Sequence, residues 1–343
     1  MNLQQRIQAF SKLGIYISEC ISTAESNTEF LKVLRKAESQ NPWFTNKNSI
    51  QAFLGISKML EEKQLLTWIQ NYIFTEKSPK TIAVIMAGNI PMVGFHDALC
   101  VLITGNNLLA KLSSKDSVFM HFLFQKLIEI EPEFDTFITI EEGFVTDFDA
   151  IITTGSNNSS RYFEYYFNSY PHIIRKHRNS IGVIIGNEDK ETLQKFGSDI
   201  LLYFGLGCRN ISKLYIPEDF DISQIIDCFQ PYETLVAHNK YMNNYEYNKS
   251  IYLVSQQPHL DNGFLLFKED FAISSPLAVV YYEKYSNFAE LQTYITMNTD
   301  VIQCIVCKDD AFNKKNIEPG DTQSPNVWDY ADDIDTILFL LNL

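Results

Sequence analysis

Short apolar segments that end in small or polar residues alternate with segments of helical periodicity along most of this chain. Four of the apolar segments are expected to be strands: 81–88, 107–113, 148–156 and 180–186. Three segments between them, with apolar residues at three- and four-residue spacing, are expected to be helices: 93–102, 117–130 and 158–170. Strands that alternate with helices form right-handed β-α-β units around a parallel sheet. The sequence therefore predicts an α/β fold.

The alternation continues after Gly205 through "ISKLYIP", "PLAVVYYE" and "VIQCIVC", which is enough for a second α/β lobe. A chain of 343 residues is too long for one simple core and suits two packed lobes. Residues 1–78 differ, because their apolar positions have helical spacing throughout, with the longest predicted helix at 50–73. We therefore expect a helical N-terminal segment followed by two α/β lobes.

Charge and composition argue against several classes of partner. The formal net charge of −14 argues against a nucleic-acid partner, since phosphate contacts need clustered lysine and arginine. No stretch reaches the ~18 uninterrupted apolar residues of a membrane-spanning helix, and the first residues lack the features of a signal peptide. A cytoplasmic location with reduced cysteines is therefore expected. The "CIVC" at 304–307 predicts a buried strand rather than a metal site.

Small or polar residues follow the first three predicted strands, at the edge where parallel sheets bind ligands. Asn89 precedes Pro91, so it is either an N-cap of the next helix or an amide donor aimed at a reacting oxygen. Lys111 is either an exposed strand end or a ligand of a hydroxyl or phosphate. Gly155 and Ser156 form a turn that is either a helix cap or an anion site at a helix N-terminus.

Cys208 lies between two glycines and an arginine in "FGLGCRN". We expect it to precede a helical segment, where the helix N-terminus and the adjacent Arg209 would both favour the thiolate. The alternative is a small apolar residue that packs at the end of a strand. By chemistry alone both remain open.

The motifs in their order resemble the aldehyde dehydrogenase superfamily, and more narrowly its acyl-CoA reductase branch, which includes the fatty-acid reductase component of bacterial bioluminescence systems. An Asn-x-Pro follows the first strand, a lysine the second, a Gly-Ser turn the third, and a cysteine comes about fifty residues later. The stretches that carry the resemblance are "NPWF", "AGNIPMVGFHD", "LLAKLSSKD", "TTGSNNSSRYFEYYF", "RKHRNSIGVI", "FGLGCRNISKLYIP" and "TQSPNVWDYADDIDTILFL". They extend from residue 41 to near the C-terminus.

The resemblance implies two Rossmann-like lobes with a cleft between them. It divides the chain into an N-terminal helical segment (1–78), a cofactor-binding lobe (79–200), a catalytic thiol lobe (201–310) and a C-terminal segment that returns toward the active site (311–343). In the family a cysteine attacks the carbonyl carbon, and Cys208 occupies the matching position. Asn89 matches the asparagine that stabilises the oxyanion, with the backbone N–H of Cys208 as the second donor.

The cofactor contacts are also implied by the resemblance. Lys111 matches the lysine that contacts the adenosine ribose, and members that prefer NAD often carry glutamate three residues later, where this chain has Ser114. Because a carboxylate would repel a 2′-phosphate whereas Ser114 and Lys115 would accept one, NADPH is expected, with NADH as the alternative. The residues expected to contact the cofactor are Lys111, Ser113, Ser114, Gly155 and Ser156. No metal is expected.

Two departures from the family pattern bear on the reaction. The glutamate that activates water in true aldehyde dehydrogenases is absent from the corresponding "RKHRNS", which suits a thiol as the acyl acceptor or donor. The candidates there for contacts to substrate or CoA phosphates are Arg175, Lys176, His177 and Arg178. His177 is alternatively a replacement for the missing acid/base. The segment that holds the nicotinamide ribose is preserved only as Phe271 and Pro276, with Glu269 or Asp270 as candidate ligands.

The function implied is NADPH-dependent reduction of an acyl thioester, of CoA or acyl carrier protein, to an aldehyde, with a long-chain product favoured by the 25 phenylalanines and 18 tyrosines. The alternatives are a CoA-acylating aldehyde dehydrogenase, a non-catalytic acyl-binding subunit of a reductase complex, and a reductase of a phosphate ester. A homo-oligomer is expected, and an enzyme that supplies the acyl group or consumes the aldehyde is a plausible partner.

Overall fold

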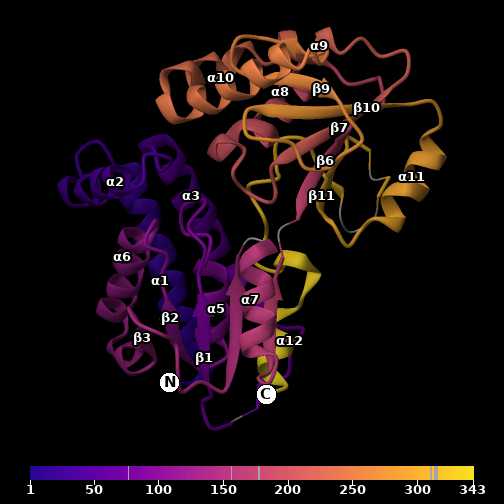
Figure 1. The fold of residues 1–343 in the computed structure, drawn as a ribbon. Helices are drawn as coiled ribbons and strands as arrows, with labels where there is room; N and C mark the ends of the chain where they lie inside the picture. The colour runs from indigo at the N-terminus through magenta and orange to yellow at the C-terminus, as the bar shows by residue number, and fades with distance from the viewer. Residues whose placement is uncertain (76, 156, 177, 310, 313–315) are drawn as a thin grey trace. The chain divides into compact units, whose positions relative to one another are not determined.

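The computed structural model of the chain describes residues 1–75, 77–155, 157–176, 178–309, 311–312 and 316–343. They divide into two compact units, each of which is described by itself (Figure 1). Unit 1 consists of Met1–His177 and Pro325–Leu343, and unit 2 of Arg178–Ser324. The chain therefore leaves unit 1 once and returns to it once, so that its last residues fold with its first half.

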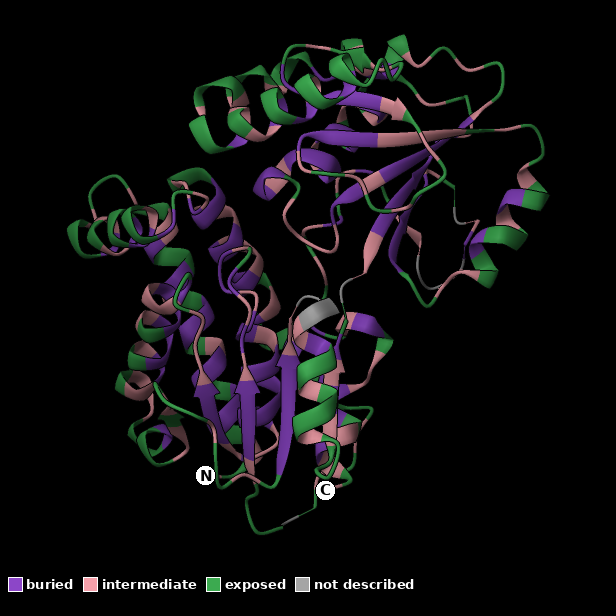
Figure 2. Ribbon diagram, in the orientation of Figure 1, coloured by how far each residue is buried: buried purple, intermediate pink, exposed green. Residues whose placement is uncertain are grey.

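Unit 1 is built on a parallel sheet. Its described strands are β1 (Thr81–Ile85), β2 (Asn107–Lys111), β3 (Ile138–Ile140), β4 (Ala150–Thr154) and β5 (His172–Arg175). Their order is β3-β2-β1-β4-β5, and every neighbouring pair is parallel. The three central strands are mostly buried (Figure 2). Because the winding direction reverses between β1 and β4, the carboxyl ends of these strands are where such a sheet binds ligands.

The helices of unit 1 bury apolar faces against this sheet and against one another. They are α1 (Leu3–Ser22), α2 (Thr28–Gln40), α3 (Asn46–Met59), α4 (Glu62–Ile69), α5 (Phe95–Ile103), α6 (Ser117–Ile130), α7 (Asn157–Phe167) and α12 (Thr336–Leu341). The helix expected over 50–73 is two helices, because Leu60 ends α3 and Glu61 begins the next turn. The N-terminal helices contact α5 and α6, and Arg6 Nε donates to the carbonyl oxygen of Ile103 at 3.0 Å.

Unit 2 contains the second sheet. Its described strands are β6 (Asn179–Val183), β7 (Ile211–Pro217), β8 (Leu260–Asp261), β9 (Leu266–Glu269), β10 (Val279–Tyr285), β11 (Ile302–Val306) and β12 (Asn316–Ile317). Their order is β12-β11-β6-β7-β10-β9-β8, and only the edge pair of β8 and β9 is antiparallel. Two units with parallel sheets and N-terminal helices confirm the predicted α/β fold.

The helices of unit 2 accompany that sheet, and the longest of them is α10 with 16 residues. They are α8 (Lys190–Leu201), the 3-10 turn η2 (Leu202–Gly205), α9 (Ser223–Cys228), α10 (Asn239–Val254) and α11 (Phe288–Met297). Cys304 and Cys307 are buried within or directly after β11, which confirms the predicted buried strand. In the part of the chain that the structure describes, no helix is long and apolar enough to cross a membrane.

The two units group the chain differently from the four segments expected from the sequence. Residues 1–78 and 325–343 both pack into unit 1, and the boundary between the lobes lies at 177/178 instead of 200/201. The reason is strand pairing, because β6 bonds to β7 and β11 and so belongs to the second sheet. The alternation of strands and helices does not reveal which sheet a strand joins.

Candidate active site

The polar residues predicted after the first three strands lie at one edge of the unit 1 sheet. Ile85 at the end of β1 is in register with Lys111 of β2 on one side and with Thr153 of β4 on the other. The loops that follow β1 and β2 are in close contact, because a Cβ added at Gly88 would lie 2.4 Å from the Ser113 Oγ. Glycine is therefore required at position 88 for these loops to approach.

Asn89 lies in the bend after β1, and its side chain is exposed. It does not cap the next helix, since the N-cap of α5 is Gly94 and no side chain bonds there. The simple structural explanation for this asparagine, an N-cap, is therefore wrong. An exposed amide at the carboxyl end of the first strand is consistent with the predicted role as a donor to a substrate oxygen.

A side chain of α2 forms a hydrogen bond to the loop after β2. Gln40 Nε2 donates to the carbonyl oxygen of Ser114 at 2.7 Å, and the backbone N–H of Lys115 donates to the Ser113 Oγ at 3.2 Å. The Lys111 ammonium donates to the carbonyl oxygen of Glu142. The side chains of Ser114 and Lys115 are exposed, so a hydroxyl and an ammonium stand at the sheet edge where a phosphate could be bound.

Asp116 is a buried carboxylic acid in this region that sequence analysis did not single out. Its side chain is 3% exposed, and its Oδ2 accepts the backbone N–H of Met92 at 2.6 Å. Met92 has a φ of 57°, in the left-handed region that a non-glycine residue seldom adopts. Burial raises the pKa of Asp116 well above its usual range, although the Met92 bond lowers it. The acid therefore stabilises a strained turn three residues after Asn89.

The turn after β4 has no room for a side chain at its glycine. A Cβ at Gly155 would lie 2.8 Å from the Cβ of Ser159 and 3.1 Å from the ring of Phe163, both on α7. The predicted contacts at Ser156 and His177 lie outside the described residues. Of the cofactor residues predicted from the family, Lys111, Ser113, Ser114 and Gly155 come together at this edge of unit 1.

Cys208 lies in unit 2, in a loop of residues 206–210 that we call the Cys208 loop. The loop follows η2 and precedes strand β7, so the expectation that Cys208 begins a helical segment is wrong. A helix N-terminus therefore does not stabilise a thiolate here. The residue is half-buried, whereas the other five cysteines are at most 6% exposed. A small residue packed at a strand end does not require this partial exposure.

A strained turn directly precedes the Cys208 loop in the chain, and hydrogen bonds of an asparagine fix the loop. Tyr203 and Phe204 have φ angles of 53° and 59°, and each left-handed non-glycine residue costs about 1–2 kcal/mol. Asn210 Oδ1 accepts the backbone N–H of Gly207 at 2.8 Å. Its Nδ2 lies within donating distance of three carbonyl oxygens at the end of α8, those of Asp199, Ile200 and Leu202. Asn210 thus supplies partners for carbonyls that a helix terminus otherwise leaves without them.

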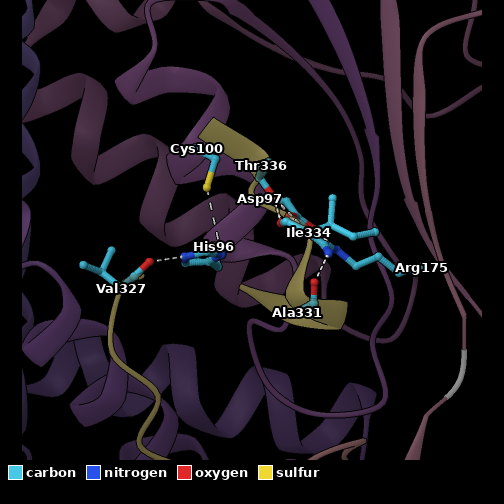
Figure 3. A network of polar contacts seen from close by, with 8 residues as sticks. All are labelled: His96, Asp97, Cys100, Arg175, Val327, Ala331, Ile334 and Thr336. Atoms are coloured by element: carbon cyan, nitrogen blue, oxygen red, sulfur yellow. Dashed lines mark hydrogen bonds and ion pairs between the residues drawn. The ribbon is translucent and has the colours of Figure 1, made fainter. Parts of the chain in front are cut away.

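Arg175 is buried in unit 1, which overturns the prediction that it contacts CoA phosphates. Its side chain is 5% exposed, and its Nη2 donates to Asp97 Oδ1 at 2.6 Å (Figure 3). The same guanidinium donates to the carbonyl oxygen of Ala331 and to the Oγ1 of Thr336. Its charge is therefore used to join β5, α5 and the C-terminal segment. Lys176 is exposed and paired with Glu164, and Arg178 is half-buried in unit 2.

His96, which is adjacent to Asp97, bonds to the same C-terminal segment. Its Nε2 lies 2.7 Å from the carbonyl oxygen of Val327 (Figure 3). A carbonyl only accepts, so Nε2 carries the proton and Nδ1 is left to face the Cys100 Sγ at 4.0 Å. Burial lowers the pKa of His96, which favours the neutral ring. This network therefore gives His96 and Asp97 of "FHD", and the carbonyls of Val327 and Ala331 in "VWDYADD", a structural role.

The segment expected to hold the nicotinamide ribose is in unit 2. Glu269 ends β9 with an exposed side chain, whereas Asp270 is paired with Lys268 and accepts the backbone N–H of Ala272. Phe271 is 84% exposed. Because the carboxylate of Asp270 already has partners, Glu269 is the better candidate of the two for a ligand.

Solved structures share this fold at low sequence identity. An aldehyde dehydrogenase 21 from Physcomitrella patens aligns with 100% of this chain and 84% of its own, at 13% identity and a TM-score of 0.69. An indole-3-acetaldehyde dehydrogenase from P. syringae, solved with NAD+, aligns with 89% of this chain and 72% of its own, at 12% identity and a TM-score of 0.64. An aldehyde dehydrogenase from Mycobacterium tuberculosis, also solved with NAD+, aligns with 87% of this chain and 72% of its own, at 15% identity and a TM-score of 0.59.

A search of curated proteins finds no match to this chain. The family model of acyl-CoA reductase (LuxC) matches residues 8–223, which is more than half of the chain and includes Asn89, Lys111 and Cys208. The match and the shared fold indicate an oxidoreductase that acts on acyl or aldehyde substrates. The chain belongs to the acyl-CoA reductase (LuxC) family.

Proposed function

We propose that this protein reduces an acyl thioester, of CoA or of an acyl carrier protein, to an aldehyde through an acyl-Cys208 intermediate, with NADPH as the hydride donor. The observation that carries the proposal is the partial exposure of Cys208 in a loop whose flanking residues are fixed by hydrogen bonds. Family membership supports the substrate class. The NAD+ complexes of proteins with this fold support a nicotinamide cofactor.

In this reaction the Cys208 thiolate attacks the carbonyl carbon of the acyl thioester. The new carbon–sulfur bond forms as the bond to the carrier breaks, and the carrier leaves as a thiolate that takes up a proton. Asn89 and the backbone N–H of Cys208 donate to the oxyanion that develops on the carbonyl oxygen. The absence of a carboxylate in "RKHRNS" supports this scheme, because the segment then lacks the carboxylate base that would activate water to hydrolyse the acyl-enzyme.

The residues at the edge of unit 1 fit a nicotinamide dinucleotide. The carboxyl ends of β1 and β4 are the usual position for one, and Gly88 and Gly155 let the backbone pack without side chains there. Lys111 and Ser113 would hold the ribose, and Ser114 with Lys115 would accept a 2′-phosphate. When bound, the nicotinamide supplies the hydride that reduces the thioester carbon. Unit 1 would thus hold the cofactor, and unit 2 would supply the thiol.

The substrate and its partners follow from the same proposal. Lys176, His177 and Arg178 remain the candidates for contacts to CoA phosphates, since Arg175 is buried and its charge is already neutralised by Asp97. A long apolar acyl chain suits the aromatic content of the sequence. Because aldehydes are reactive, we propose a partner enzyme that takes up the product, a cytoplasmic location and a homo-oligomeric state.

The test is covalent labelling of the intact protein. Purified protein is mixed with a long-chain acyl-CoA without cofactor and weighed by mass spectrometry. The wild type is expected to gain one acyl group, and Cys208→Ala none. Cys228→Ala is the matched control, because this second thiol of unit 2 is 6% exposed and should not affect labelling. NADPH or NADH added afterwards should release the label as aldehyde, and the faster of the two identifies the cofactor.

Other results separate the alternatives. Acyl-CoA formed from aldehyde, CoA and NADP+ faster than the reverse reaction would indicate a CoA-acylating dehydrogenase. Label from neither acyl-CoA nor acylated carrier protein would leave a non-catalytic subunit. Label that persists in Cys208→Ala would contradict the assignment of the nucleophile.

A further inference from the structure

A second buried acid lies next to the Cys208 loop and has no role in the reaction proposed above. Asp199, near the C-terminal end of α8, is 1% exposed. Its Oδ2 accepts the backbone N–H of Gly320 at 2.7 Å. Its Oδ1 accepts both the backbone N–H and the Oγ1 of Thr322, at 3.2 and 2.8 Å. Three donors from one segment therefore converge on a single carboxylate.

Asp199 and Thr322 also bond to the two residues that directly follow Cys208. Arg209 Nε donates to the carbonyl oxygen of Thr322 at 2.6 Å. Asn210 Nδ2 donates to the carbonyl oxygen of Asp199 at 3.0 Å. Hydrogen bonds thus join Arg209 to Thr322, Thr322 to Asp199 and Asp199 to Asn210, and the peptide bond between residues 209 and 210 closes the ring. Cys208 directly precedes the two members that belong to the loop.

The ionisation of Asp199 suits this arrangement. Burial raises its pKa to about 6, and the bonds from Gly320 and Thr322 lower it. At pH 7 the group is therefore mostly the carboxylate, which only accepts hydrogen bonds, and all three of its partners are donors. Thr322 is fully buried, so water does not compete for these bonds.

We propose that Asp199 is a positioning residue that, through Thr322, holds the Cys208 loop in its reactive conformation. The proposal rests on the proposed function, because it assigns Asp199 to the nucleophile of that reaction. The loop needs such support, since the turn that leads to it contains two strained residues, Tyr203 and Phe204, and strain persists only where surrounding contacts impose it. Without Asp199, Arg209 would lose the fixed carbonyl to which it bonds.

Three variants of the full chain test this role. Asp199→Asn replaces the acceptor-only carboxylate with an amide, Thr322→Val removes the Oγ1 donor at nearly constant volume, and Thr322→Ser keeps it. Leu193→Ala is the control, because Leu193 is 3% exposed on the same helix and bonds to no member of the ring. The single-turnover rate of Cys208 acylation by acyl-CoA and the KM for acyl-CoA are measured and normalised to the folded fraction from circular dichroism.

Asp199→Asn and Thr322→Val are expected to lower the acylation rate by on the order of 10- to 100-fold, the range for a nucleophile displaced by up to an ångström. The KM should stay within about twofold, and Thr322→Ser should restore most of the rate, since only the position of the thiol has changed. Leu193→Ala should lose stability but keep its rate per folded molecule. Wild-type rates in folded Asp199→Asn and Thr322→Val would overturn the proposal.

Failure of the proposed function gives a different result. In that case the wild type itself is not acylated, and hydrogen exchange of the backbone amides at 206–210 decides the inference. Faster exchange in Asp199→Asn and Thr322→Val, but not in Leu193→Ala, would support the role of Asp199 in holding the loop. Equal exchange in all four proteins would refute it.

Discussion

The Arg175 guanidinium and the Asp97 carboxylate form an ion pair with an N–O distance of 2.6 Å, and both side chains are at most 8% exposed. Arg175 ends β5, the last strand before the chain leaves unit 1, and it also binds Ala331, which follows the return of the chain to that unit. The two passages of the chain across the unit boundary are thus joined through one guanidinium.

Breaking this pair should destabilise the protein strongly. Arg175→Met leaves the Asp97 carboxylate buried without its cation, and such changes cost about 3–5 kcal/mol of unfolding free energy. Urea denaturation of the wild type and the variant measures the difference.

The double variant Asp97→Leu with Arg175→Met is the control for charge. Because neither charge then remains, it should recover at least half of the loss, as buried pairs replaced by apolar groups often do. A single variant that unfolds within ~0.5 kcal/mol of the wild type would contradict the structural role of the pair.

Asn89→Ala should slow acylation of Cys208 and leave folding intact. The side chain is exposed and does not cap α5, so the variant should fold, whereas loss of an oxyanion donor costs on the order of 10²–10³ in rate. Stopped-flow measurement of CoA release gives the rate, and thermal melting gives the stability. Asn71→Ala, at an exposed turn of the same unit, should match the wild type in both. If Asn89→Ala acylates at the wild-type rate, the amide is no oxyanion donor.

Ser114→Glu should shift cofactor preference from NADPH toward NADH. A carboxylate close to the 2′-phosphate adds a repulsion of at least ~1.4 kcal/mol, which is on the order of tenfold in the ratio of kcat/KM values. Steady-state kinetics with both cofactors measures the ratio. Ser39→Glu adds the same charge at an exposed position on α2 and should not change it. If the ratio of kcat/KM values for the two cofactors is unchanged in Ser114→Glu, the 2′-phosphate of NADPH does not bind next to residue 114.

Asp199 should make the protein less stable as pH rises from about 4 to about 6. Its folded pKa, about 6, is above its ordinary value of 3.8, so in this window the folded state holds the proton more tightly than the unfolded state does. Ionisation therefore favours unfolding by up to about 1.4 kcal/mol per pH unit. The Tm of the wild type minus that of Asp199→Asn should fall across this window and stay level above pH 7. A difference that is flat from pH 4 to 7 would mean that Asp199 titrates normally.

Much of the site could be predicted from sequence because its signals are local. The strand that ends at Lys111 and those before Asn89 and Gly155 could be predicted from their apolar runs, and parallel pairing then brings their ends to one edge. Asp116 and Asp199 could not be found in this way, since neither stands in a motif and each owes its role to burial. Asn210, which fixes the Cys208 loop, was not singled out from the sequence either, although it follows Cys208 by only two residues.

The sequence by itself determined the α/β class, the alternation of strands with helices and the family, because periodicity and motifs are properties of neighbouring residues. It did not reveal the strands β3 and β5. Only the tertiary structure decided that β6 belongs to the second sheet, that Cys208 precedes a strand and that Arg175 is buried. Each of these depends on a partner that is distant in the chain, as Asp97 is from Arg175. The pairing of distant residues is determined by packing and by the energetic cost of burying an unpaired charge. Neither of these produces a periodic pattern in the sequence.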